Sequence, residues 1–139
     1  MTDPSTRPGD VASALVMHET GGSTDPAVVA AAVEGICRYV ASELEGMLGS
    51  GGVSSLMIRV LHLARREHPS LDGVTLSAGP VIGFTGLPEA LAGGTPAAGT
   101  SIIAQLLGLL VVLLGEDLGL QPVRKFWPHV APHFREIEE

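Results

Sequence analysis

The chain has 139 residues, of which 45% are hydrophobic and only 17% are charged, against about 25% charged in ordinary globular domains. The formal net charge of −7 argues against nonspecific nucleic-acid binding, which needs clustered positive charge. The single cysteine, Cys37, excludes an internal disulfide and a zinc site built from cysteines. Because the N-terminal residues show no secretory signal pattern, we expect one cytoplasmic domain with no nucleic-acid partner.

The N-terminal region predicts a tail followed by a short helix. Residues 1–9 are polar and contain two prolines, which predicts a flexible tail. Asp10 is a candidate N-cap for a helix over residues 11–19. We place the domain itself at residues 10–128 and a polar C-terminal tail at residues 129–139.

Two longer helices are predicted next. Asp25 followed by Pro26 is a strong helix start, and we expect a helix over residues 27–48. Its apolar residues recur at spacings of three and four: Val29, Val33, Ile36, Val40, Leu44 and Met47. A third helix is predicted over residues 53–68, ending before Pro69.

Residues 71–99 are rich in glycine and proline, which predicts a long loop rather than a long regular element. Within it, residues 74–77 could be extended and residues 87–91 could form one helical turn. A loop of this length in a small domain is either functional or disordered.

The most apolar stretch is residues 102–118, IIAQLLGLLVVLLGEDL. We predict a helix there, with Thr100 or Ser101 as its N-cap, and a last short helix over residues 122–127. A helix that is apolar on all sides is typical of the centre of a bundle. The predicted fold is therefore all-α, a small bundle of about four to six helices around this central helix.

The end of the apolar helix allows two arrangements. Glu116 and Asp117 would lie at its C-terminus, where the helix dipole disfavours acids. Either they pair with Arg124 or Lys125, or the helix breaks at Gly115 and the acids begin a new helix.

The same stretch permits a membrane-associated alternative, anchored through residues 97–115. These 19 positions hold no charged residue, close to the roughly 20 apolar residues that a spanning helix needs. The strongly apolar part, however, is only residues 102–114, which is the length of a buried core helix, so we favour the core.

One face of the third predicted helix is basic, with Arg59, His62, Arg65 and Arg66. His62 could accept a phosphoryl group, as in histidine phosphotransfer bundles. The residues after His62 do not fit the lysine and glycine that those domains carry there, so a solvated basic face is the simpler interpretation.

The segment with the strongest functional indication is Arg124, Lys125, Phe126 and Trp127, because aromatic and arginine side chains are enriched in interaction hot spots. The alternative is that Trp127 only seals the base of the bundle.

We find no catalytic, metal-ligand or cofactor motif, so we expect no enzyme activity, metal or cofactor. The excess of apolar residues over what a small bundle buries favours self-association. The sequence thus predicts a non-catalytic protein-interaction or regulatory adaptor module, most simply a homodimer. A membrane contact is the weaker alternative, and a histidine phosphotransfer bundle using His62 is a further one.

Overall fold

The structure is a computed structural model, and it describes residues 8–77 and 83–128. These residues form a mostly helical fold, as predicted, with one two-stranded antiparallel sheet. In chain order the elements are α1 (Pro8–Thr20), α2 (Pro26–Glu67), the 3-10 helix η2 (Pro69–Gly73), β1 (Thr75–Leu76), β2 (Phe84–Thr85), α3 (Leu87–Gly93), α4 (Pro96–Gly119) and α5 (Gln121–Phe126). Pro8 and Gly9, which we assigned to the N-terminal tail, already belong to α1, whereas residues 1–7 and 129–139 lie outside the described part.

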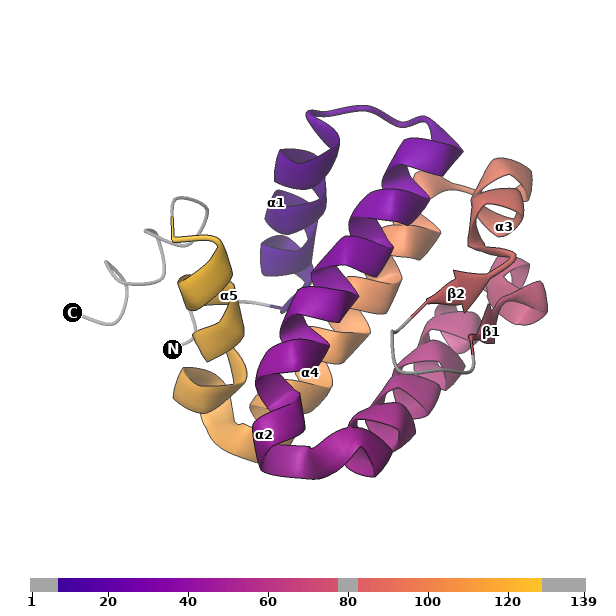
Figure 1. Cartoon of the computed structure of the whole chain (residues 1–139). Coiled ribbons are helices and arrows are strands. Elements are labelled where there is room, and N and C mark those ends of the chain that lie inside the picture. The colour runs from indigo at the N-terminus through magenta and orange to yellow at the C-terminus, as the bar shows by residue number, and fades with distance from the viewer. Residues whose placement is uncertain (1–7, 78–82, 129–139) are drawn as a thin grey trace.

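Helix α2 combines the second and third predicted helices. The Asp25 carboxylate accepts a hydrogen bond from the Ala27 N–H at 3.1 Å, so the predicted N-cap is confirmed. The helix bends at Gly49, whose φ of 71° and ψ of 167° lie in a region that only glycine enters readily. The two halves of α2 therefore form a V that opens upward in Figure 1.

Helix α4 begins earlier than predicted. Thr95, rather than Thr100 or Ser101, is its N-cap: the Thr95 hydroxyl accepts from the Ala97 N–H at 3.3 Å, and Pro96 follows in the first turn. Proline suits this position because its missing N–H has no partner to lose there.

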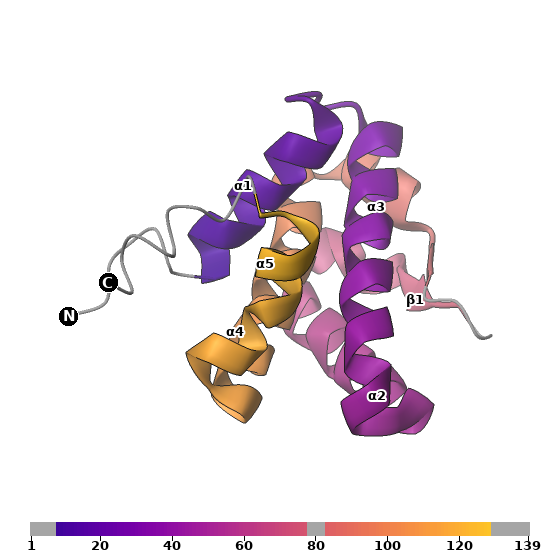
Figure 2. The ribbon, with the colours of Figure 1, turned by 60° about the vertical axis from the view of Figure 1, so that its left-hand side comes forward.

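The second of the two predicted arrangements is found at the other end of α4. Gly115 has a φ of 85° and a ψ of 164°, so the helix breaks there. The chain then folds back, and a Cβ added at Gly119 would stand 2.8 Å from the Leu110 carbonyl group. Figures 1 and 2 place the end of α4 and the bend of α2 at the same, lower end of the molecule.

Helix α4 packs against α1 and both halves of α2. Its large buried side chains are Ile102, Ile103, Leu106, Leu107 and Leu110, and none lies beyond Leu110. The expectation that residues 102–118 are covered on all sides is thus wrong for the last third of the stretch, where Val112, Leu113 and Leu118 are exposed.

Among the described helices, α4 alone is long and apolar enough to span a membrane by length and composition. In its most apolar 18-residue window, 44% of the residues are buried inside the fold. Core helices of soluble proteins meet the same criterion of length and composition, so α4 fits both a buried core helix and a membrane-spanning helix by this measure.

The prediction of residues 71–99 as mainly loop is wrong for the described part, which is divided among η2, β1, β2, α3 and the start of α4. The extended piece expected over residues 74–77 and the helical turn expected over residues 87–91 correspond to β1 and α3. Two charged side chains of α2 hold this region. The Glu34 carboxylate accepts from the Phe84 N–H at 2.7 Å, and Arg65 donates to the carbonyls of Leu71 and Val74. The Glu34 contact joins positions 50 residues apart, so the order of this region depends partly on tertiary contact.

Candidate functional site

Trp127, at the end of the segment with the strongest functional indication, is a core residue in this structure. It is 3% exposed, and its indole N–H donates to the Glu19 carboxylate. The Tyr39 and Phe126 rings lie 5.8 and 5.9 Å from the Trp127 ring, between centroids. Trp127 therefore joins α1, α2 and α5, which is the sealing arrangement that we considered as the alternative to an interaction site.

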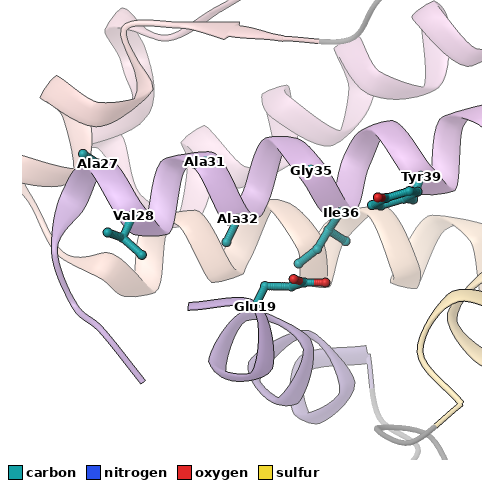
Figure 3. A pocket seen from close by; sticks show the side chains of 8 residues that line it. All are labelled: Glu19, Ala27, Val28, Ala31, Ala32, Gly35, Ile36 and Tyr39. Carbon is teal, nitrogen blue, oxygen red and sulfur yellow. The ribbon is translucent and has the colours of Figure 1, made fainter. Parts of the chain in front are cut away.

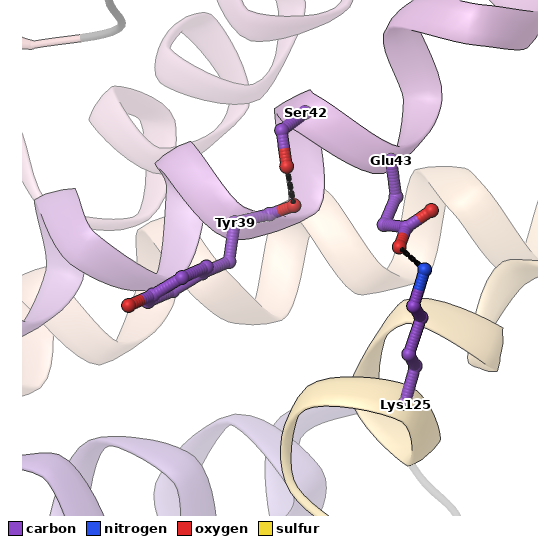
Figure 4. A network of polar contacts seen from close by, with 4 residues as sticks. All are labelled: Tyr39, Ser42, Glu43 and Lys125. Atoms are coloured by element: carbon purple, nitrogen blue, oxygen red, sulfur yellow. Dashed lines mark hydrogen bonds and ion pairs between the residues drawn. The ribbon is translucent and has the colours of Figure 1, made fainter.

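The rest of that segment makes contacts within the chain. Lys125 forms an ion pair with Glu43 (Figure 4), and its ammonium lies 5.7 Å from the Phe126 ring centroid. Arg124 donates to the Asp117 carbonyl at 3.3 Å. The Arg124 guanidinium thus contacts the backbone of the folded-back end of α4.

A concavity lies beside this aromatic group, between the end of α1 and the first half of α2 (Figure 3). We call it the α2 groove; its volume is about 470 Å³. It is lined by Glu19, Ala27, Val28, Ala31, Ala32, Gly35, Ile36 and Tyr39.

The lining of the α2 groove is apolar and shallow. Val28 is 38% exposed and Tyr39 is 53% exposed, one toward each end of the groove, and small residues separate them. Glu19 is the single charged lining residue, and one of its oxygens already accepts from Trp127. The arrangement offers no set of groups for acid–base or nucleophilic chemistry, but its small side chains would let another helix approach closely.

A second unusual surface is the end of α4. Val112, Leu113 and Leu118 are 80%, 62% and 50% exposed, and we call this group the apolar corner. Glu116 and Asp117, both exposed, lie within it in the sequence. Neighbouring exposed apolar side chains of this size mark interaction surfaces more often than scattered ones do.

Three of the four residues of the predicted basic face are exposed. Arg65 is half-buried and occupied by the Leu71 and Val74 carbonyls, whereas Arg59, His62 and Arg66 are exposed. The phosphoacceptor hypothesis for His62 stays a prediction.

Cys37 is fully buried. Burial raises the pKa of its thiol, and the neighbouring Glu34 carboxylate raises it further, so the thiol lacks the acidity of a nucleophile. Within residues 8–77 and 83–128, no group of three or more histidine, cysteine or acidic side chains is placed to hold a metal ion.

No protein-family model matches the chain, and neither the curated proteins nor the solved structures include a match. Function therefore has to be argued from the surfaces themselves.

Sequence reasoning missed both surfaces, although the α2 groove has a visible signal. Ala27, Ala31 and Gly35 recur every four residues and predict a smooth stripe along α2. The exposure of Val112 and Leu113 had no such signal, because a fully apolar helix does not show which of its sides is covered.

Proposed function

We propose that this protein is a non-catalytic protein-interaction module that self-associates through the α2 groove. The observation that supports the proposal is the lining of the groove, an apolar helix face with small residues at its centre and larger ones, Val28 and Tyr39, toward its ends. A helix face of this shape needs a covering element, and none of the described elements supplies one.

The order of residues in the groove suits pairing with its own copy. In an antiparallel pair of α2 helices related by a two-fold axis, each position opposes its mirror position on the other copy. An axis between Val33 and Glu34 sets Val28 opposite Tyr39 of the second copy and Ala32 opposite its Gly35. The two larger side chains then oppose each other, and the two small ones oppose each other nearer the axis. The two helices can therefore pack at about 8–10 Å between their own axes.

The groove itself would bring little like charge together in such a pair. Glu19 is the only charged residue in the lining, so few like charges would be brought together by the two-fold axis. Burying Val28 and Tyr39 would contribute about 25 cal/mol for each Å² of apolar surface removed from water.

Sedimentation equilibrium of the wild type and of Ala31→Arg tests the proposal. Ala31 is exposed, so the fold accepts arginine, but the larger charged side chain would fill the groove. We expect a dimer for the wild type and a dissociation constant raised at least about tenfold for Ala31→Arg, equivalent to about 1.4 kcal/mol.

Ala92→Arg is the matched control, because Ala92 is also an exposed helical alanine but lies on α3. Equal dissociation of both variants, or a monomeric wild type at high concentration, contradicts self-association through the groove.

A second candidate, membrane association, has one observation in its favour: the length and apolar character of α4. Insertion of α4 would require its buried half to leave α1 and α2. If α4 stays in the core of the bundle, the protein should remain in the lipid-free fraction after flotation with phosphatidylcholine vesicles. Recovery with the vesicles would favour the membrane.

A further inference from the structure

The apolar corner is a different surface from the α2 groove and carries a different charge. Val112 and Leu113 project beyond the last buried turn of α4, and Leu118 follows the break at Gly115. Exposing three large aliphatic side chains within seven residues is unfavourable in water, and among the described residues these three stay 50% to 80% exposed.

Negative charge surrounds these side chains. Glu116 and Asp117 are exposed and lie between Leu113 and Leu118 in the sequence. The straight part of α4 ends at Gly115, so the negative end of its helix dipole lies at the same place. Arg124, which is half-buried, contacts this segment by donating to the Asp117 carbonyl.

A further acid stands at this end of the molecule. Glu45 is exposed and precedes the bend of α2, which lies at the same end as the break in α4 (Figures 1 and 2). Close to the bend, Met47 adds a fourth large apolar side chain at 55% exposure. Apolar surface and acids therefore occur together at this end.

We infer that the apolar corner docks a basic amphipathic helix of another protein. The apolar face of such a helix would cover Val112, Leu113 and Leu118, while its lysines or arginines would meet Glu116 and Asp117. Charge complementarity decides the occupant: a second copy placed on this corner would bring the same acids against each other, which disfavours the contact. The net charge of −7 also attracts a basic partner at long range.

The test uses the full-length protein and a fluorescent 18-residue helical peptide with leucines on one face and lysines on the other. A second peptide replaces every lysine with glutamate. In fluorescence anisotropy, we expect the protein to bind the lysine peptide and not the glutamate peptide. Leu113→Asp should weaken binding by at least about tenfold, because it places a charge where apolar contact is needed.

Ile58→Asp is the matched apolar control, because Ile58 is 60% exposed on the second half of α2. It should leave peptide affinity unchanged. Circular dichroism melts of both variants show whether each one is folded.

The double variant Glu116→Lys/Asp117→Lys tests the charge. We expect about a tenfold or greater loss of affinity for the lysine peptide, since each reversal turns an attraction into a repulsion. Asp72→Lys/Glu89→Lys changes the net charge equally at exposed positions on η2 and α3, and should cause a clearly smaller loss.

Three outcomes overturn the inference. Equal losses in the two double variants would assign peptide binding to net charge alone. Unchanged binding by a folded Leu113→Asp variant would remove the corner from the contact. Flotation with phosphatidylcholine vesicles that depends on Leu113, without peptide binding, would assign the corner to a membrane surface. Failure of the groove variants to affect dimerisation leaves this inference intact, because the two surfaces are tested separately.

Discussion

Single charged residues hold the least regular part of the fold. The Glu34 carboxylate accepts a hydrogen bond from the Phe84 N–H at 2.7 Å, and the Arg65 guanidinium donates hydrogen bonds to the Leu71 and Val74 carbonyls. Both residues could be assigned to a polar helix face from their spacing alone. In the structure they satisfy backbone groups of the segment between α2 and α3, whose β1–β2 pairing is only two residues long.

The Cys37 thiol is predicted to react slowly in the folded protein. Its thiol is buried, and burial beside Glu34 raises its pKa, so very little thiolate is present near neutral pH and reagents cannot reach it. We expect DTNB to react with the native protein at least about a hundredfold more slowly than with the unfolded chain.

The measurement is simple because Cys37 is the only cysteine. The same assay in guanidinium chloride gives the unfolded reference. Fast labelling of the native protein would show that the surrounding core opens readily.

At the level of elements, two glycines break the long helices in nearly the same way. Gly49 and Gly115 have φ values of 71° and 85° with ψ values of 167° and 164°. Each break reverses the local course of the chain, and together they place the bend of α2 and the end of α4 at one end of the bundle. The apolar corner exists because of the second break.

Gly119 is predicted to be intolerant of a side chain. A Cβ there would meet the Leu110 carbonyl carbon and oxygen at 2.8 Å, and backbone atoms cannot move aside as a flexible side chain can. We expect Gly119→Ala to lower the free energy of unfolding by about 1–3 kcal/mol, measured by urea denaturation.

Gly108→Ala is the matched control on the same helix. Nothing lies within 4 Å of its added Cβ, and alanine favours helix by up to about 1 kcal/mol over glycine. This variant should therefore be neutral or more stable. Equal destabilisation of both variants would contradict the folded-back arrangement.

For the whole molecule, charge separates the two proposed contacts. The α2 groove has one acid, Glu19, whereas the apolar corner has Glu116 and Asp117 beside a helix C-terminus. A chain of net charge −7 that pairs with itself is opposed by long-range repulsion, which salt screens.

Ionic strength should therefore act oppositely on the two contacts. Between about 0.05 and about 0.5 M NaCl, we expect self-association to stay constant or tighten, while binding of the lysine peptide weakens. Sedimentation and anisotropy titrations in the same buffers measure both. A dimer that dissociates as salt increases would mean that opposite charges hold it together, contrary to the groove proposal.

Local signals in the sequence were sufficient for the helical fold and for several helix boundaries. Asp25 with Pro26 predicted the start of α2, and Gly115 was recognised as a possible break, because capping and left-handed backbone depend on a few adjacent residues. The start of α4 was missed, since Thr95 and Pro96 were taken as part of a loop.

Only the tertiary structure decided which apolar and aromatic residues are covered. Trp127 is buried against Glu19, 108 residues away, while Val112 and Leu113 remain exposed on a helix that is apolar all round. Residues 71–99 were predicted mainly as loop from their glycine and proline, and the hydrogen bond that the Phe84 N–H donates to Glu34, 50 residues away, could not be seen in the local sequence. Helix caps and breaks are local interactions, whereas burial depends on neighbours that the fold brings together from distant parts of the chain.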